Sequence, residues 1–406
     1  MHVPSFFRRD GLRHQLPVFA SLVVIVVLLV LPTGYEDLLQ YRGAERCLAL
    51  VLDTDNSTIM DSGLIRSGEQ RCTLNILDGR FRGSIVQGVN MLNGSLELDK
   101  IFVPGDRVTA VVSHADGAIR SVSLIDHYRL DKELLLFACF AAFLILFAGR
   151  TGLRALLSFA LTVLMIWKVL VPCYLDGWNP VLTGLGVTLT LTIVIISLVY
   201  GFDGRAAAAI SGSFLGIAVT CLLGMLFTDL FHIHGAIMSG SESLLYSGYP
   251  HLNLTGIFMA SIFIGSSGAV MDLAVDITSA VREVTEKRPD LTWIEAARSG
   301  MNVGRAAMGT MTTTLLLAYS GGYVTLLMVF MAQGTPITNI LSYKYVAAEI
   351  ADTMVGSFGL VSVAPFTALS AGILLGKKRR RRALSFLRQR RSTPEVRICT
   401  QEGDRA

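Results

Sequence analysis

Long apolar runs constrain this chain more than any other feature of its sequence. A scan for runs near the roughly 20 residues that span a bilayer finds about eight of them. Hydrophobic residues make up 52% of the chain and charged residues only 16%, as is typical of integral membrane proteins. The runs are too long and continuous for the alternating strands of a membrane β-barrel. We therefore expect an α-helical polytopic membrane protein with spans near residues 16–31, 133–149, 154–174, 180–200, 206–228, 254–276, 307–331 and 347–375.

Basic residues predict the orientation of these spans. Arginines and lysines gather in alternate connecting segments and in both terminal segments, whereas the other short loops hold only Lys344. By the positive-inside rule both termini are cytoplasmic, which an even number of spans requires. The first run follows Arg8, Arg9 and Arg13 and lacks an Ala-x-Ala cleavage site, so we interpret it as an uncleaved anchor.

The chain divides into five expected parts. A cytoplasmic N-terminus (1–15) and an anchor (16–31) precede an extracytoplasmic β-rich domain (32–132), a seven-helix membrane domain (133–375) and a basic cytoplasmic tail (376–406). The nine lysines and arginines from Lys377 to Arg391 predict binding to anionic lipids at the inner leaflet.

The outer domain alternates short β-rich runs with Gly, Asp and Asn turns. About five strands predict a small barrel, OB-like in one interpretation, or an open sheet. Mixed charges and few aromatic residues argue against a nucleic-acid surface, and a protein partner of this domain is one expectation. Its only cysteines, Cys47 and Cys72, are compatible with a disulfide or with two free thiols.

A polar stripe on the sixth run is the leading site candidate. Glycines and carboxylates on an apolar helix are disfavoured against lipid and should face protein or water. Asp272 falls in the inner third of its span, where a carboxylate needs a partner or a proton, so we interpret it, with Asp276, as an ion or proton site. Alternatively, Asp276 belongs to a solvated helix end. In a helix the stripe comprises Gly265, Gly268, Asp272, Asp276, Ser279 and Glu283.

The following helix supplies the other candidates for this site. Arg305 is expected near the aspartates as a counter-charge, and Thr310, Thr312 and Thr313 are expected to line the gap between the two helices. The alternative is structural, because threonine hydroxyls also hydrogen-bond across helices or to their own backbone.

A second polar cluster is expected at the outer ends of the spans. Asp229, Glu349 and Asp352 are candidates for the mouth of a pathway, with an ordinary interfacial loop as the alternative. His232 and His234 lie nearby, but their spacing in a Gly/Ser loop does not define a metal site, and we expect no metal or cofactor. Motifs of soluble enzymes such as Gly-x-Ser-x-Gly, His-Glu-x-x-His and Cys-x-x-Cys are absent, so we do not expect an enzyme.

Several long motifs carry a family resemblance. GFDGRAAAAISG, GSSGAVMDLAVDITSAVREV, EAARSGMNVGRAAMGTMTTTLLLAYSGG and YVAAEIADTMVGSFGLVSVAPFTA together resemble the YibE/F-like family of bacterial multi-pass membrane proteins over most of residues 130–375. The resemblance implies a bacterial inner-membrane protein but no established activity. Its motif positions here are Asp203, Gly204, Arg205, Gly268, Asp272, Asp276, Gly304, Gly309, Thr310, Thr312 and Glu349.

A weaker resemblance concerns mechanism. The order of a glycine, an aspartate, Arg-Glu, a short loop and a Thr-rich helix is similar to the core of RND-type and SecD/SecF-type proton-driven membrane proteins. Here the span count is about eight instead of six per unit, and the aspartates lie closer to the inner edge.

Two functions from different classes follow. The first is a secondary transporter or export component, coupled to protons or cations through Asp272. The second is a membrane scaffold or assembly factor that recruits a partner through its outer domain. The sequence leaves open whether the chain forms a homo-oligomer.

Overall fold

The computed structural model describes residues 9–35, 44–115 and 117–390, with side chains for residues 15–35, 44–115 and 117–376. The chain forms two compact units, one of residues 34–152 and one of residues 1–33 and 153–406. The side chains of Lys377 to Arg391, predicted to bind anionic lipids, lie outside the described residues.

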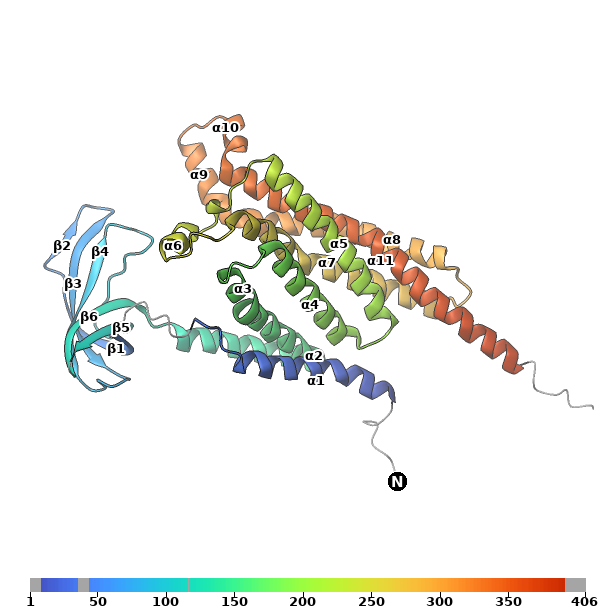
Figure 1. Cartoon of the computed structure of the whole chain (residues 1–406), viewed down its shortest axis with the longest axis horizontal. Helices are drawn as coiled ribbons and strands as arrows, with labels where there is room; N and C mark the ends of the chain where they lie inside the picture. The colour runs from blue at the N-terminus through green and yellow to red at the C-terminus, as the bar shows by residue number, and fades with distance from the viewer. Residues whose placement is uncertain (1–8, 36–43, 116, 391–406) are drawn as a thin grey trace, which may run out of the picture. The chain divides into compact units, whose positions relative to one another are not determined.

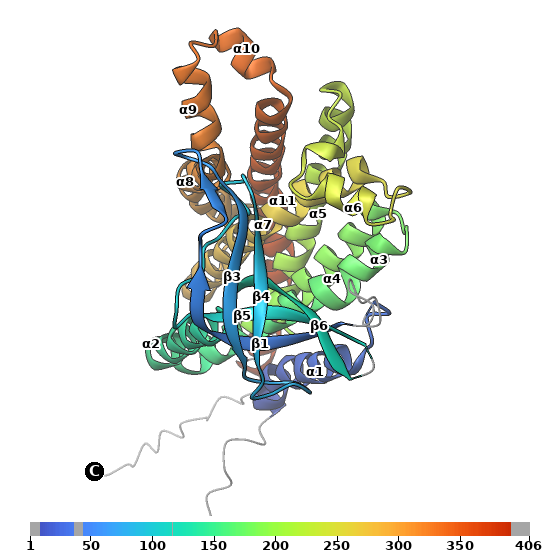
Figure 2. The same ribbon diagram turned by 90° about the vertical axis from the view of Figure 1, so that its left-hand side faces the viewer.

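The first unit contains a closed β-barrel, whose strands are drawn in blue to teal in Figure 2. The sheet has the order β1-β5-β6-β4-β3-β2, and antiparallel pairing of β1 with β3 closes it. One parallel bridge, Val89 with Ser123, joins β4 to β6. This is the order of an OB-like Greek-key barrel extended by β2, so the small barrel is confirmed. The strands are β1 (Ala44–Asp55), β2 (Ile59–Asp61), β3 (Arg66–Ile76), β4 (Ile85–Asn93), β5 (Arg107–Ala115) and β6 (Ala118–His127).

A buried polar network ties the 94–102 loop to β3 and β4. Gln70 is fully buried, and its amide nitrogen donates to the Phe102 carbonyl at 2.8 Å. Its amide oxygen accepts from the Phe102 N–H at 3.0 Å and from Asn90 Nδ2 at 3.1 Å. Because these bonds satisfy the backbone of the 94–102 loop, Phe102 can fill the barrel core.

The barrel cysteines are free thiols. Cys72 pairs with Thr54 in the β1–β3 ladder, whereas Cys47 lies near the other end of β1. At about 3.3 Å per residue the two positions are about 23 Å apart along the strand, far beyond the reach of a disulfide. The strand register therefore shows that Cys47 and Cys72 are two free thiols and do not form a disulfide.

Burial makes these thiols unreactive. It raises the pKa of Cys72 to about 11, and burial together with the nearby Asp78 and Glu45 carboxylates raises the pKa of Cys47 to about 11. The reactive thiolate is therefore scarce at neutral pH and increases only as the pH approaches 11. We predict that iodoacetamide at pH 8 labels neither cysteine in the folded protein but labels both in guanidinium, as measured by mass spectrometry. Ser62→Cys, in an exposed turn, is the reactive control; fast labelling of the native thiols would contradict the structure.

The second unit is a helical bundle (Figure 1). Short connecting elements are η2 (Ile166–Leu170), α3 (Val171–Leu175), η3 (Gly235–Ile237), α6 (Ser241–Tyr246), η4 (Gly321–Tyr323), α9 (Val324–Ala332) and α10 (Ile337–Ser342). The long helices are α1 (Arg9–Val30), α2 (Leu130–Met165, which begins in the first unit), α4 (Pro180–Tyr200), α5 (Gly204–Leu230), α7 (Leu254–Lys287), α8 (Trp293–Ser320) and α11 (Lys344–Arg390).

Six helical segments of the described chain are long and apolar enough to cross a membrane. The runs expected at 133–149 and 154–174 fall in one segment of 46 residues, Leu130–Leu175. A straight helix of that length would measure about 69 Å, more than twice the hydrocarbon core. The backbone breaks at Gly149, which has a positive φ of 54° that glycine adopts readily. The first run forms a shorter apolar helix, Gln15–Val30, so the count of eight spans stays a prediction.

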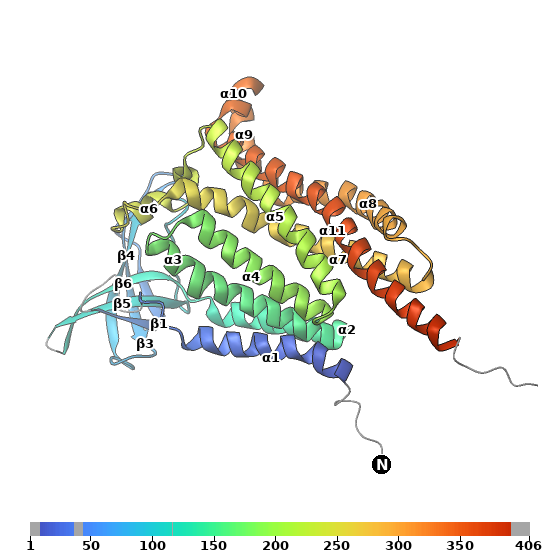
Figure 3. The same ribbon diagram turned by 45° about the vertical axis from the view of Figure 1, so that its right-hand side comes forward.

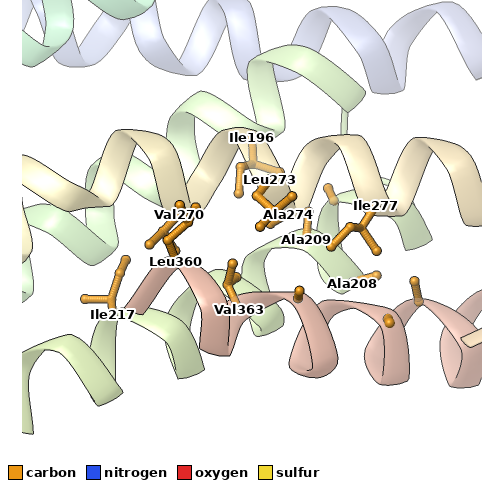
Figure 4. Packing of buried hydrophobic residues seen from close by; sticks show 14 of the residues in the cluster. Ile196, Ala208, Ala209, Ile217, Val270, Leu273, Ala274, Ile277, Leu360 and Val363 are labelled. Atoms are coloured by element: carbon orange, nitrogen blue, oxygen red, sulfur yellow. The ribbon is translucent and has the colours of Figure 1, made fainter. Parts of the chain in front are cut away.

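The bundle core lies between α4, α5, α7, α8 and α11. Small and branched side chains interlock there, as Figure 4 shows for Ala208 and Ala209 of α5 beside Ile277 of α7 and Val363 of α11. Because α7 contributes to this core along most of its length, it is the central helix of the bundle.

The backbones of α5 and α11 approach closely where the two helices cross (Figure 3). A Cβ added to Gly212 would lie 2.7 Å from Thr367 Cα, and one added to Gly216 would lie 3.0 Å from Val363 Cβ. One added to Gly359 would collide with the Thr220 hydroxyl. Glycine at these three positions permits the approach, as is common between membrane helices.

We predict that Gly212→Ala destabilises the bundle, because the added methyl group forces α5 and α11 apart. Overpacking of this kind costs about 1–3 kcal/mol. Gly186→Ala on α4 is the matched control, since a Cβ there meets nothing within 4 Å. Thermal unfolding in detergent should show a lower midpoint for Gly212→Ala only, and equal midpoints would contradict the packing described.

Candidate functional site

Two carboxylates lie inside the bundle on α11. Glu349 and Asp352 are partly buried, and Glu349 Oε1 and Asp352 Oδ1 are shielded from solvent without a hydrogen-bond partner among the described residues. The flanking residues Ala348, Ala351 and Val355 are buried in an apolar cluster with α7 and hold this part of α11 in place. Unpaired buried oxygens are costly in a membrane and mark positions where a proton, cation or water binds.

Two tyrosines complete this group of residues. Tyr319 of α8 lies within electrostatic range of both carboxylates, and its buried hydroxyl also has no partner in the described chain. Tyr323 of η4 lies within hydrogen-bonding reach of Glu349. We call Tyr319, Tyr323, Glu349 and Asp352 the carboxylate cluster.

The two carboxylates of the carboxylate cluster lie near the beginning of α11. At 1.5 Å per residue, Asp352 is about 12 Å along α11 from its first residue, Lys344. Gly265 of α7, beside Tyr319, is about 16 Å from the start of that helix at Leu254. Glu349 and Asp352 thus lie in the first turns of α11, at the end of the helix where the sequence expects the mouth. Asp229, the third mouth candidate, is exposed next to the end of α5 at Leu230.

The polar stripe of α7, which we call the α7 stripe, is the face of this helix that the described chain leaves uncovered. Gly265, Gly268, Asp272, Asp276, Ser279 and Glu283 are all exposed, whereas the opposite face is buried in the core. A Cβ on Gly268 would meet nothing within 4 Å. Between Gly265, beside which the Tyr319 hydroxyl lies, and Ser279, which binds Tyr200, the face is open at Gly268, Asp272 and Asp276.

Arg305 and the threonines of α8, which were expected to lie near the two aspartates, make other contacts or none with them in the described chain. Asp272 and Asp276 form no ion pair with Arg305 in the part of the chain that the structure describes, and Arg305 is exposed on α8. The threonine hydroxyls of Thr310, Thr312 and Thr313 bind backbone oxygens of their own helix, at 3.0, 2.9 and 3.4 Å. The hydroxyl protons of these threonines are therefore already engaged.

A clamp that sequence reasoning missed holds the α4–α5 turn against α7. The Tyr200 hydroxyl lies 2.6 Å from the Val275 carbonyl, to which it donates, and 2.6 Å from Ser279 Oγ, from which it accepts. The Arg205 guanidinium lies over the Tyr200 ring at 5.0 Å and binds Asp203 at 2.8 Å. The GFDGR motif contains two of these residues, but nothing in it points to Tyr200 or to α7.

A metal centre is not formed by the described residues. They contain no group of three or more His, Cys, Asp or Glu side chains that could hold a metal ion. His232 and His234 border a pocket of about 360 Å³ with Lys344, and His234 Nδ1 accepts the Ala236 N–H at 3.1 Å.

These features define a multi-helix membrane protein with buried ionisable groups. The family model described as YibE/F-like protein matches residues 136–377, more than half of the chain. The chain therefore belongs to the YibE/F-like family. The searches of curated proteins and of solved structures found no match.

We predict that the α7 stripe is wetted. In a background without native cysteines, Asp272→Cys and Gly268→Cys should react with a water-soluble methanethiosulfonate reagent in membranes, because a polar face is disfavoured against lipid. Leu215→Cys is the control: Leu215 is 47% exposed on an apolar face, and its neighbour Gly216 lies level with Val270 of α7. Equal, slow reaction at all three positions would place the α7 stripe against lipid or protein instead.

Proposed function

We propose that this protein is a secondary transporter or export component driven by protons or cations, with Glu349 and Asp352 as its coupling groups. The observation that carries this proposal is the set of buried, unpartnered oxygens of Glu349, Asp352 and Tyr319 in the interior of the bundle. Ionisable groups within membrane-spanning helices mark ion and proton pathways, and Glu349 and Asp352 lie on a helix long and apolar enough to span a membrane.

The proposal includes a topology. The six long segments, division of Leu130–Leu175 at Gly149, and the helix Gln15–Val30 together give eight spans. Both termini are then cytoplasmic and the barrel lies outside the inner membrane, as the distribution of basic residues favours.

The coupling chemistry follows from burial. Two neighbouring carboxylates in a low-dielectric interior cannot both remain ionised without a large free-energy cost. A proton or monovalent cation bound between them removes much of this cost, so the occupied site is the stable one. Release of the ion leaves two negative carboxylates next to each other. A rearrangement of α8 and α11 that separates them or lets water reach them lowers this electrostatic cost. The Tyr323 side chain near Glu349 can donate to the ionised form.

Ion flux into liposomes tests this proposal. Under an imposed pH gradient, wild-type protein should take up protons, whereas Glu349→Gln and Asp352→Asn should each lower the uptake at least about a hundredfold, as loss of an essential acid or base commonly does. Asp229→Asn is the matched control, because Asp229 is exposed near the end of α5. Cation-driven uptake is measured in parallel with Na⁺ and K⁺ gradients, with an ionophore as leak control. Full flux in both variants would contradict the proposal.

A second candidate, a scaffold that binds a partner through the barrel, is favoured by one observation. A groove of about 350 Å³ at the β2–β3 turn and the 94–101 loop is bordered by Leu64 and Leu96, which are 83% and 77% exposed. Exposed apolar patches of this kind mark interaction sites. Under this alternative, the double variant Leu64→Ser, Leu96→Ser abolishes partner binding by the barrel and reproduces the phenotype of a deletion strain. Asp352→Asn leaves both partner binding and phenotype as in the wild type.

A further inference from the structure

We infer that the crevice where the barrel meets α2 binds the headgroup of a phosphatidylethanolamine molecule from the leaflet on the barrel's side. In this site the lipid phosphate pairs with Lys132 and the lipid ammonium group pairs with Glu133, while an acyl chain lies along Leu136. The site is separate from the carboxylate cluster and does not depend on the proposed function.

The crevice has a volume of about 650 Å³ and lies within the first compact unit. The turn before β5, with Gly105 and Asp106, forms one wall, and the first turns of α2 form the other. Arg107 links the two walls. Its carbonyl accepts the Tyr128 N–H at 2.8 Å, and its guanidinium lies 3.7 Å from the Asp131 carboxylate. These contacts join the barrel to the start of α2 and give the crevice a defined shape.

One side of α2 borders the crevice. Leu136 follows Glu133 and Lys132 at steps of three and four residues, so the three side chains lie on the same side of the helix. The apolar run of this candidate span begins at Leu134, directly after the charged residues, and Leu136 is 73% exposed. In a membrane the two charges therefore lie in the headgroup layer, whereas Leu136 meets acyl chains.

The charges around the crevice leave one cation and one anion without a protein partner. Lys132 and Glu133 form no ion pair with any residue that the structure describes. The other charged side chains there form three pairs of a basic and an acidic group, 3.0 to 3.7 Å apart: Arg107 with Asp131, His127 with Asp106, and Arg129 with Asp126.

A zwitterionic headgroup satisfies both remaining charges at once. Phosphatidylethanolamine has a phosphate for Lys132 and an ammonium group with three N–H donors for Glu133. The trimethylated ammonium group of phosphatidylcholine has no N–H to donate, and phosphatidylglycerol has no cation for Glu133. The charge pattern therefore favours phosphatidylethanolamine over the other two lipids.

Native mass spectrometry of the full-length protein in detergent tests the site. Delipidated protein is titrated separately with phosphatidylethanolamine, phosphatidylglycerol and phosphatidylcholine that carry the same acyl chains. Lys132→Gln and Glu133→Gln should each weaken the binding of phosphatidylethanolamine about fivefold, the upper end for one partly exposed ion pair. Glu133→Gln should not weaken the binding of phosphatidylglycerol, which has no group that pairs with Glu133.

Glu69→Gln and Arg71→Gln are the matched controls. These two side chains form an exposed ion pair on β3 at 3.9 Å and do not border the crevice, so both variants should bind all three lipids as the wild type does. Wild-type affinity for phosphatidylethanolamine in Lys132→Gln and Glu133→Gln would overturn the site. An equal loss of affinity for all three lipids in Glu133→Gln would also overturn it, because the ammonium group would then not be recognised.

A soluble competitor separates a lipid from a free headgroup compound. Glycerophosphoethanolamine carries the same headgroup without acyl chains, so it lacks the contact with Leu136. It should displace phosphatidylethanolamine only when in large excess. Displacement at a concentration equal to that of the lipid would identify a soluble phosphoethanolamine compound as the occupant and would overturn the lipid site.

Discussion

The close approach of α5 and α11 is the constraint on which the rest of the bundle depends. At Gly212, Gly216 and Gly359 the side chains of one helix fill the space that a Cβ would take on the other. Interhelical distance in a membrane is set by such packing, because lipid provides no hydrophobic drive to pull helices together. Since α11 also packs on α7 and α8, its placement sets the positions of Glu349 and Asp352 relative to Tyr319.

The bundle separates its polar groups into two kinds of position. Glu349, Asp352 and Tyr319 lie inside with unsatisfied oxygens, whereas Asp272 and Asp276 lie on an uncovered face. A structural polar network would be fully hydrogen-bonded, as Gln70 is in the barrel. Glu349 and Asp352 are the carboxylates among the unsatisfied groups of the described bundle, and the proposed coupling role rests on them.

Local signals in the sequence were enough for three predictions. Apolar runs predicted the membrane class, long motifs predicted the family, and β-rich runs between turn residues predicted the small barrel. Sequence periodicity also placed Asp272 correctly on a stripe with Gly265 and Gly268, since helical spacing fixes a face. Which face is covered depends on packing between distant helices, so neither the exposure of that stripe nor the position of Tyr319 on the side of α8 that faces α7 could be predicted. The free state of Cys47 and Cys72 likewise depends on strand register, which their spacing does not encode.

The central claim is that Glu349 and Asp352 bind a transferable proton. Infrared difference spectroscopy of the protein in lipid, stepped between acidic and alkaline pH, measures this directly through the carbonyl band of protonated carboxyl groups. The account predicts a band in the wild type that shifts or disappears in both Glu349→Gln and Asp352→Asn and persists in Asp229→Asn. An identical spectrum in the wild type and in all three variants would contradict it.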